Sequence, residues 1–130
     1  MIVVDASAMV EALVGRAVAP GLLDSLVGEV HAPHLLDIEV FSTLRGLVLG
    51  DKLTLAAADD ARRDYVDLGI IRHSAAPFAE RIWQLRHRLT SHDASYVALA
   101  EGLGAPLVTC DRTLDTEAHD AEVRVFASFE

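Results

Sequence analysis

Four acidic residues are spaced so that together they could hold a divalent metal ion for phosphodiester chemistry. Asp5 and Asp111 each follow a short apolar segment, whereas Glu39 and Asp93 lie in segments with helical periodicity. Carboxylates gathered in one place repel one another and raise their own pKa values, and a bound cation removes that cost. Ligands that are all oxygen suit Mg²⁺ or Mn²⁺, which can activate water and neutralise the charge of a phosphodiester transition state.

The apolar pattern predicts the elements that must position these acids. The predicted strands are 1–5, 30–32, 70–72, 106–109 and 123–126, and the predicted helices are 6–14, 22–27, 35–49, 54–68, 77–89, 92–103 and 112–118. Short strands that alternate with helices predict an α/β fold, with a central parallel sheet of four to five strands flanked by helices on both faces. Right-handed crossovers then bring the carboxyl ends of the strands to one edge, where such sheets bind ligands.

Simpler roles explain each acid taken singly, and the residues alone leave these roles open. Asp93 is a favoured residue type for capping a helix, and Asp5 could cap the helix that follows its strand. Glu39 could simply be solvated. These roles do not explain why the two clearest predicted strands both end in aspartate.

Four segments, in order along nearly the whole chain, resemble the PIN-domain ribonucleases, and in particular the VapC-type toxins of toxin–antitoxin systems. They are IVVDASAMV with Asp5, LLDIEVFSTLRGL with Glu39, RLTSHDASYVALAE with Asp93, and LVTCDRTL with Asp111. The third segment is the most specific. The chain departs from the family at Ser42, three residues after Glu39, where members often carry asparagine.

The resemblance implies a PIN fold and an endoribonuclease that depends on Mg²⁺ or Mn²⁺, with Asp5, Glu39, Asp93 and Asp111 as catalytic and metal-binding residues. It implies RNA as substrate, with products that carry a 5′-phosphate and a 3′-hydroxyl. It also implies neutralisation by a cognate VapB-type antitoxin, and a homodimer that forms a heterotetramer or larger complex with it. A non-catalytic PIN module that only binds a protein partner is the alternative, and the intact acidic set argues against it.

Neighbouring polar residues are candidates for supporting roles. Ser7 and Thr109 could hydrogen-bond the carboxylates or their bound waters. Asp115 would share a helical face with Asp111 if 112–118 is a helix, and it is either an outer ligand or solvated. Cys110 should face away from its two neighbours and pack in the core.

Two arginines are candidates for binding the substrate. Arg86 lies seven residues before Asp93 and Arg112 directly follows Asp111, so each could reach a phosphate, pair with an acid or simply be solvated. Trp83 is predicted to lie in the core or on a dimer face of the predicted 77–89 helix.

Composition limits the class of protein and raises one objection. The 130 residues are 52% hydrophobic with a single cysteine; this predicts one folded domain over 1–130, in the cytoplasm, without an internal disulfide or a membrane span. A receiver domain would need a lysine at a late strand end, but the only lysine is Lys52, between two predicted helices. A haloacid-type phosphatase would need an aspartate at position 7, which is Ser7 here.

The net charge of −9 argues against a nucleic-acid partner. However, residues 45–88 carry eight basic and six acidic side chains, and bound cations would offset the acidic remainder.

Overall fold

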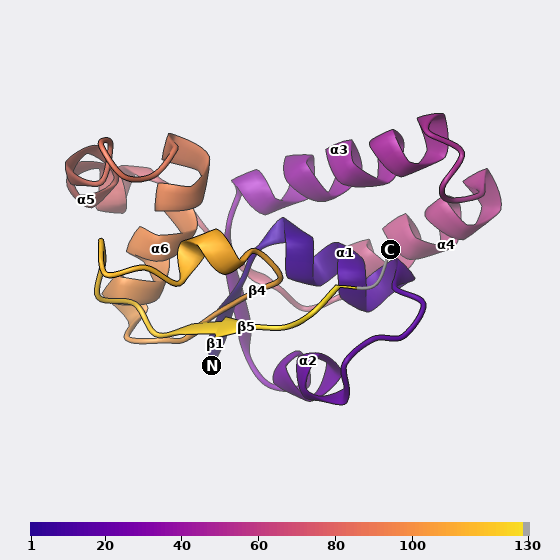
Figure 1. The fold of residues 1–130 in the computed structure, drawn as a ribbon, viewed down its shortest axis with the longest axis horizontal. Coiled ribbons are helices and arrows are strands. Elements are labelled where there is room, and N and C mark those ends of the chain that lie inside the picture. The colour runs from indigo at the N-terminus through magenta and orange to yellow at the C-terminus, as the bar shows by residue number, and fades with distance from the viewer. Residues whose placement is uncertain (129–130) are drawn as a thin grey trace.

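The computed structural model describes residues 1–128, which are built around one parallel sheet (Figure 1). Its five strands lie in the order β3-β2-β1-β4-β5. They are β1 (Ile2–Val4), β2 (Val30–Pro33), β3 (Ile71–His73), β4 (Leu107–Thr109) and β5 (Val123–Val125). All four neighbouring pairs are parallel, which confirms the predicted parallel sheet.

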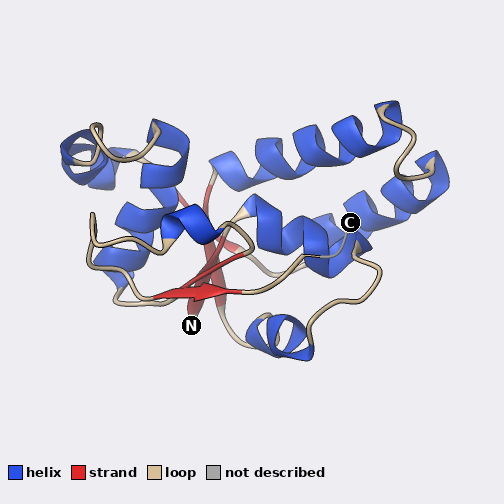
Figure 2. Cartoon of the chain, viewed as in Figure 1, coloured by secondary structure: helices blue, strands red, loops and turns tan. Residues whose placement is uncertain are grey.

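Helices cover both faces of the sheet, as Figure 2 shows with the strands in red. They are α1 (Ala6–Val14), α2 (Pro20–Ser25), α3 (Leu35–Leu49), α4 (Leu55–Asp67), α5 (Ala79–Gln84) and α6 (Ser91–Leu103). The chain passes from β1 to β2 to β3 in one direction across the sheet and returns past β1 to β4. Because crossovers are right-handed, α1, α3 and α4 lie on one face, and α5 and α6 lie on the other.

This reversal of strand order makes β1 and β4 neighbours at the centre of the sheet. Their register places Val3 beside Leu107 and Val4 beside Val108. In an open α/β sheet the crevice for ligands lies beyond the carboxyl ends of the two strands at such a switch point. The residues that emerge from these two strands are Asp5 and Asp111.

The sheet is fixed in place by side chains that are fully withdrawn from water. Val3 and Val4 in β1, and Leu107 and Val108 in β4, are all 0% exposed. Burial of a branched side chain of this size contributes about 1.5–3 kcal/mol. Small residues on α6, namely Ala94, Val97, Ala98 and Ala100, are also buried and allow this helix to approach the strands that it covers.

The predicted helix 77–89 is wrong in its length. A 3₁₀ turn at Ala76–Phe78 leads into α5, which stops at Gln84. The next residue, Leu85, is buried, and its N–H is shared between the carbonyls of Arg81 and Ile82. The main chain therefore turns at Leu85 to bury this side chain, and a series of turns continues to α6.

The predicted helix 112–118 is also wrong, since only a 3₁₀ turn, Arg112–Leu114, forms there. Leu114 is buried and its carbonyl oxygen contacts Nε2 of His119 at 2.6 Å, so this carbonyl bonds to a side chain rather than to a further helical turn.

No helix within residues 1–128 is long and apolar enough to cross a membrane.

One ion pair fixes the far edge of the sheet to the helices. Arg72 Nε in β3 donates to both carboxylate oxygens of Asp37 in α3 at 3.0 Å. The hydroxyl of Tyr65 in α4 donates to the same carboxylate at 2.5 Å. Asp37, which lies two residues before Glu39, therefore has a structural role.

Candidate active site

Asp5 is at the end of β1 and is nearly withdrawn from water, with 7% of its surface exposed. One carboxylate oxygen accepts hydrogen bonds from Ser7 Oγ at 2.7 Å and from the N–H of Ala8 at 3.0 Å. The bond from Ala8 caps α1, so the capping role considered for Asp5 is real. The second oxygen accepts a hydrogen bond from Thr109 Oγ1 at the end of β4. The carboxylate is thus held at the switch point by three donors.

Ser7 and Thr109 connect the ends of β1 and β4 through these hydroxyl groups. Their oxygens lie 3.2 Å apart. Thr109 Oγ1 accepts the N–H of Asp111 at 2.9 Å, and Ser7 Oγ accepts the N–H of Cys110 at 2.9 Å. Both hydroxyls therefore contact the acidic site as predicted, and both orient the main chain that carries Asp111.

Asp111 caps the 3₁₀ turn that follows β4. Its Oδ1 accepts the N–H of Thr113 at 2.9 Å and the hydroxyl of Thr113 at 2.7 Å. Asp115 is exposed at the end of this turn. Because the predicted helix is absent, the shared helical face expected for Asp111 and Asp115 does not form.

Asp93 and Glu39 reach the site from α6 and α3. Thr90 caps α6 through a bond from the N–H of Asp93 to Thr90 Oγ1 at 3.1 Å, so Asp93 is not the cap. One turn later, the hydroxyl of Tyr96 donates to Glu39 Oε1 at 2.5 Å. Tyr96 has no role in the sequence-based prediction. Its position three residues after Asp93, on the same face of a helix, is the signal that could have indicated one.

The pKa values indicate that the four carboxylates act on one another. Burial raises the pKa of Asp5, and the charge of Asp111 raises it further. Burial also raises the pKa of Asp93, with additional contributions from the charges of Asp111 and Glu39. The pKa of Tyr96 is raised by burial and by its bond to Glu39, so its hydroxyl stays a hydrogen-bond donor. This concentration of negative charge is the situation that a cation would relieve.

The side chains fit a cation that keeps much of its water. Within residues 1–128, no three carboxylate, imidazole or thiol groups converge closely enough to bind one ion directly. Mg²⁺ is usually held by one or two carboxylates, with waters and substrate phosphate completing its coordination. The all-oxygen donor set and its mutual repulsion therefore fit Mg²⁺ or Mn²⁺ better than a metal that needs a closed protein cage.

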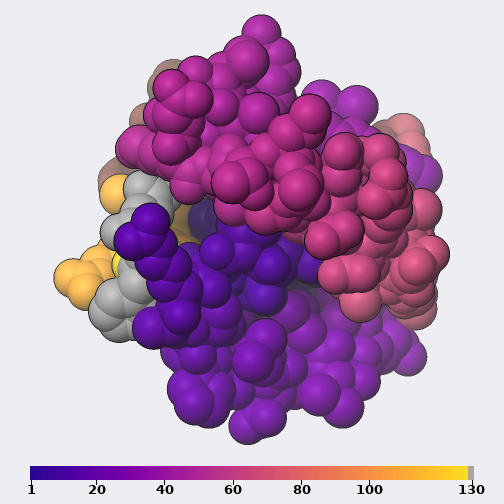
Figure 3. All heavy atoms as spheres, turned by 90° about the vertical axis from the view of Figure 1, so that its right-hand side faces the viewer, coloured from indigo at the N-terminus to yellow at the C-terminus, as the bar shows by residue number. Residues whose placement is uncertain are grey.

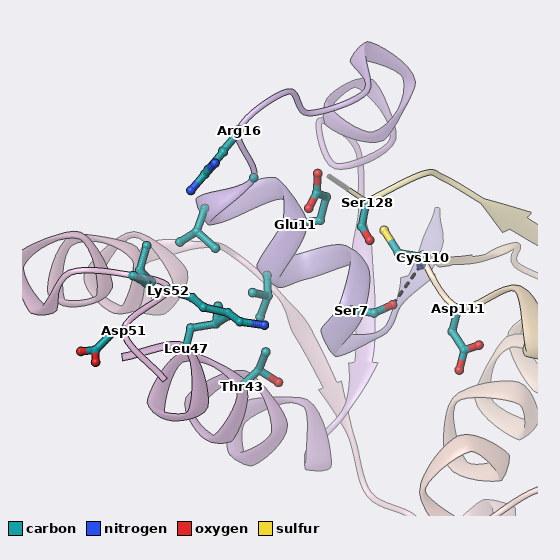
Figure 4. A pocket seen from close by; sticks show the side chains of 14 residues that line it. Ser7, Glu11, Arg16, Thr43, Leu47, Asp51, Lys52, Cys110, Asp111 and Ser128 are labelled. Atoms are coloured by element: carbon teal, nitrogen blue, oxygen red, sulfur yellow. Dashed lines mark hydrogen bonds between the residues drawn. The ribbon is translucent and has the colours of Figure 1, made fainter. Parts of the chain in front are cut away.

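A groove of about 980 Å³ begins at this site. Ser7 and Asp111 line one end, and Arg16 and Lys52 line the part between α1 and the turn from α3 to α4 (Figure 4). Figure 3 shows the hollow between α1, in indigo, and the magenta α3–α4 hairpin. Its walls also carry the apolar side chains Val10, Val14, Leu47 and Leu53.

Four further predicted residues, Cys110, Trp83, Arg86 and Arg112, lie in the groove or at the surface. Cys110 packs against the core but is only partly buried and lines the groove, and burial raises the pKa of its thiol to about 11. Trp83 is 66% exposed, so it does not lie in the core, and its place on a dimer face stays a prediction. Arg86 stacks over the ring of Trp83 instead of pairing with an acid. Arg112 is exposed beside Asp111.

Comparison with known proteins gives the family. A PIN domain model matches residues 2–118. The chain belongs to the PIN-domain family. It is 39% identical to ribonuclease VapC12 of Mycobacterium tuberculosis, over 98% of this chain and all of that protein. It is also 44% identical to ribonuclease VapC1 of the same species, over 86% of each chain.

The structural comparison supports the same fold for this PIN domain. The crystal structure of PAE2754 from Pyrobaculum aerophilum superposes with a TM-score of 0.72 at 24% identity, and covers 94% of this chain and 81% of that one. The sequence relatives named above make the chain a VapC-type member of the PIN-domain family, as its four sequence segments predict.

Proposed function

We propose that this PIN domain, acting as one unit over residues 1–130, is an endoribonuclease toxin that depends on Mg²⁺ or Mn²⁺. The main support is geometric. Asp5 and Asp111 follow the neighbouring strands β1 and β4 at the switch point of the sheet, and a hydrogen bond joins Glu39 to Tyr96 on the helix that carries Asp93. A buried carboxylate with a raised pKa costs stability, and functional sites are where such costs concentrate. Relatives named ribonuclease, matched over most of the chain, support RNA as the substrate.

Each acid has a proposed role. Asp5, Asp93 and Asp111 would hold the cation, with at most two of them bound to it directly and the rest through water. Glu39 would bind a second cation or orient the attacking water. The cation, when bound, supplies activation of water and stabilises the charge on the departing 3′-oxygen. Ser7 and Thr109 fix the carboxylate of Asp5 through the hydrogen bonds described above, and Tyr96 fixes that of Glu39.

Residues at the edge of the site would contact the RNA. Arg112, exposed next to Asp111, is proposed to contact a backbone phosphate. Asp115 is proposed to be an outer ligand through water at most, because it lies on the far end of the 3₁₀ turn. In-line attack of water on phosphorus leaves a 5′-phosphate and a 3′-hydroxyl.

The lining of the groove is an argument for binding of a protein partner as well as RNA. Its apolar walls fit an apolar segment of a VapB-type antitoxin, and the acids at its end fit a basic side chain of that segment. Such a segment would inhibit the toxin by direct competition for the site. We further propose that the toxin is a cytoplasmic homodimer, which forms a heterotetramer or larger complex with the antitoxin.

End chemistry and metal dependence together test this function. The purified chain is incubated with cellular RNA in Mg²⁺, then in EDTA, then with Mg²⁺ restored, and the new ends are mapped. We expect cleavage that stops with EDTA, returns with Mg²⁺ and leaves ligatable 5′-phosphate ends. Cleavage that survives chelation would overturn the mechanism, and absence of cleavage with any RNA would favour the catalytically silent module.

A further inference from the structure

Thr113 holds one carboxylate oxygen of Asp111 through two hydrogen bonds. Its N–H donates to Asp111 Oδ1 at 2.9 Å, and its hydroxyl donates to the same oxygen at 2.7 Å. The bond from the N–H is the one that caps the 3₁₀ turn after β4, as a capping aspartate normally does. The bond from the hydroxyl is therefore additional to the cap, and it acts on a carboxylate of the candidate site.

The two bonds leave the other oxygen of Asp111 without a donor. An ionised carboxylate offers about four lone-pair sites, two on each oxygen, so two donors occupy Oδ1. Within residues 1–128, no N–H or hydroxyl donates to Oδ2 of Asp111. Since rotation of the carboxylate would break both bonds to Oδ1, the lone pairs of Oδ2 keep one direction and stay available to a cation or to its bound water.

The main chain on both sides of this contact is itself fixed. Before the turn, the N–H of Asp111 donates to Thr109 Oγ1 at 2.9 Å. After Thr113, the side chain of Leu114 is 1% exposed, and its carbonyl oxygen contacts Nε2 of His119 at 2.6 Å. The hydroxyl of Thr113 thus comes from a backbone that is held in place, as the support of a functional side chain requires.

Two other acids of the candidate site are oriented in the same chemical way. The hydroxyl of Thr109 donates to Asp5, and the hydroxyl of Tyr96 donates to Glu39. A hydroxyl orients a carboxylate without bringing a positive charge to it, whereas an arginine or a lysine would also neutralise it. Carboxylates held by hydroxyls therefore keep the full negative charge that attracts a cation.

We propose that Thr113 is a positioning residue for the metal-dependent reaction, whose hydroxyl fixes Asp111 so that Oδ2 is the oxygen that serves the cation. This proposal rests on the function proposed above. Thr113 acts only through Asp111. Groups that hold a metal ligand in this way typically contribute about 10–100-fold to metal affinity or activity.

A role in capping alone makes a different prediction. Thr113 is exposed, and a hydrogen bond that water can replace contributes little to the stability of a fold. If the hydroxyl served only the 3₁₀ turn, its removal would lower stability slightly and leave metal affinity unchanged. If it positions Asp111, its removal lowers metal affinity and leaves stability nearly unchanged.

Metal binding without RNA tests the proposal directly. Thr113→Val removes the hydroxyl but keeps the N–H that caps the turn, and Thr113→Ser keeps both donors. Binding of Mn²⁺ to each purified protein is measured by isothermal titration calorimetry, and melting temperatures are measured in EDTA. We expect Thr113→Val to bind Mn²⁺ about tenfold more weakly with an unchanged melting temperature, and Thr113→Ser to bind like the unsubstituted protein.

Thr116→Val is the matched control from the same segment. The hydroxyl oxygen of Thr116 accepts the N–H of Ala118 at 3.4 Å, and no carboxylate takes part in this contact. Since its hydroxyl is removed in the same way without touching the site, Thr116→Val should bind Mn²⁺ normally.

Cleavage gives a second measurement of the same effect. Thr113→Val should need about tenfold more Mg²⁺ for its half-maximal rate. Its KM for RNA at saturating Mg²⁺ should be unchanged, because the proposed role of Thr113 acts on the metal ligand and not on the RNA.

Three results would overturn the positioning role. They are normal Mn²⁺ affinity in Thr113→Val, equal loss of affinity in Thr113→Ser and Thr113→Val, and absence of Mn²⁺ binding by the unsubstituted protein. Failure of this role differs from failure of the proposed function. Cleavage by the unsubstituted chain together with normal Mn²⁺ binding by Thr113→Val removes only the positioning role, and Mn²⁺ binding that depends on the hydroxyl without cleavage of any RNA removes only the nuclease.

Discussion

The hydroxyl of Tyr96 donates to the carboxylate of Glu39 across the sheet edge, at 2.5 Å. Tyr96 comes from α6 and Glu39 from α3, which lie on opposite faces of the sheet. The bond therefore joins the two layers at the candidate site. Since Tyr96 is 2% exposed, its side chain is shielded from solvent, and its hydroxyl holds one oxygen of Glu39 in a defined direction.

Tyr96→Phe should impair cleavage more than folding. Loss of the hydroxyl frees Glu39, and removal of a residue that orients a metal ligand or its water typically costs about 10–100-fold in activity. Steady-state cleavage at saturating Mg²⁺ measures this, and kcat should fall while KM for RNA changes little. Tyr65→Phe is the matched control, because Tyr65 is also buried and also donates to a carboxylate, that of Asp37, at 2.5 Å. Equal loss of activity in both variants would contradict a specific role for Tyr96.

Thr109→Val should make cleavage more sensitive to acid. The hydrogen bond from Thr109 lowers the pKa of Asp5 against the opposing effect of burial, so its loss raises that pKa further. Since the ionised carboxylate is the form that binds a cation, the acidic limb of the pH–rate profile should move to higher pH. Ser7→Ala should move it in the same direction by less, because the bond from Ser7 lowers the pKa less. An unchanged acidic limb in Thr109→Val would contradict this role.

Asp93→Asn should stabilise the protein when no metal is present. Burial and the charges of Asp111 and Glu39 raise the pKa of Asp93 in the folded state, so the folded state binds its proton more tightly than the unfolded state does. The ionised carboxylate is then a cost at every pH above the ordinary aspartate range. A neutral amide removes this cost, and the melting temperature in EDTA at pH 7 should rise by about 2 °C.

Mg²⁺ should reverse the order of the melting temperatures of Asp93→Asn and the unsubstituted protein. Binding to the folded state stabilises the unsubstituted protein by mass action, whereas Asp93→Asn should respond weakly. Asp67→Asn, an exposed acid at the end of α4, serves as the control and should melt like the unsubstituted protein in both conditions. A lower melting temperature for Asp93→Asn in EDTA, with a normal response to Mg²⁺, would exclude Asp93 from the charge cluster.

The sequence predicts those parts of the site that are indicated by the residues directly beside them in the chain. Asp5 and Asp111 could be predicted because each directly follows a strand whose apolar pattern is visible in the sequence. The bond between Tyr96 and Glu39 could not, because it joins residues 57 positions apart and depends on how two helices meet across the sheet.

Two predictions in residues 77–89 are wrong, namely the length of the helix and the core position of Trp83. They too depend on contacts between residues that are not neighbours in the sequence. Helical periodicity continues through 77–89, but burial of Leu85 turns the main chain after α5. The apolar ring of Trp83 is compatible with a core in the sequence, and only the fold shows that it faces solvent. Tertiary packing thus overrides the local pattern in residues 77–89.

Asp37→Asn should destabilise the protein at neutral pH without affecting the chemistry directly. Burial alone would raise the pKa of Asp37, but the hydrogen bonds from Arg72 and Tyr65 and the charge of Arg72 lower it below its usual range. This carboxylate therefore stabilises the fold above the ordinary aspartate pKa, and its contribution is lost as pH falls through the lowered value. We expect a loss of about 1 kcal/mol in the free energy of unfolding by urea at pH 7.

The difference in stability between the unsubstituted protein and Asp37→Asn should shrink as the pH falls below the ordinary aspartate range. Asp59→Asn provides the comparison, because Asp59 pairs with Arg62 at 2.9 Å on the surface of α4, where such pairs contribute little. A destabilisation by Asp37→Asn that is equal at pH 7 and pH 2 would show that the charge of Asp37 is not its source.

If the four carboxylates form one metal-dependent site for RNA cleavage, each of them must be needed for the reaction. The most direct test is the rate of RNA cleavage at saturating Mg²⁺ by Asp5→Asn, Glu39→Gln, Asp93→Asn and Asp111→Asn, with Asp67→Asn as control and folding checked by circular dichroism. We expect each of the four variants to fold and to lose about a hundredfold or more in rate, while the control is unchanged. Cleavage at the unsubstituted rate by a folded variant of any of the four would contradict it.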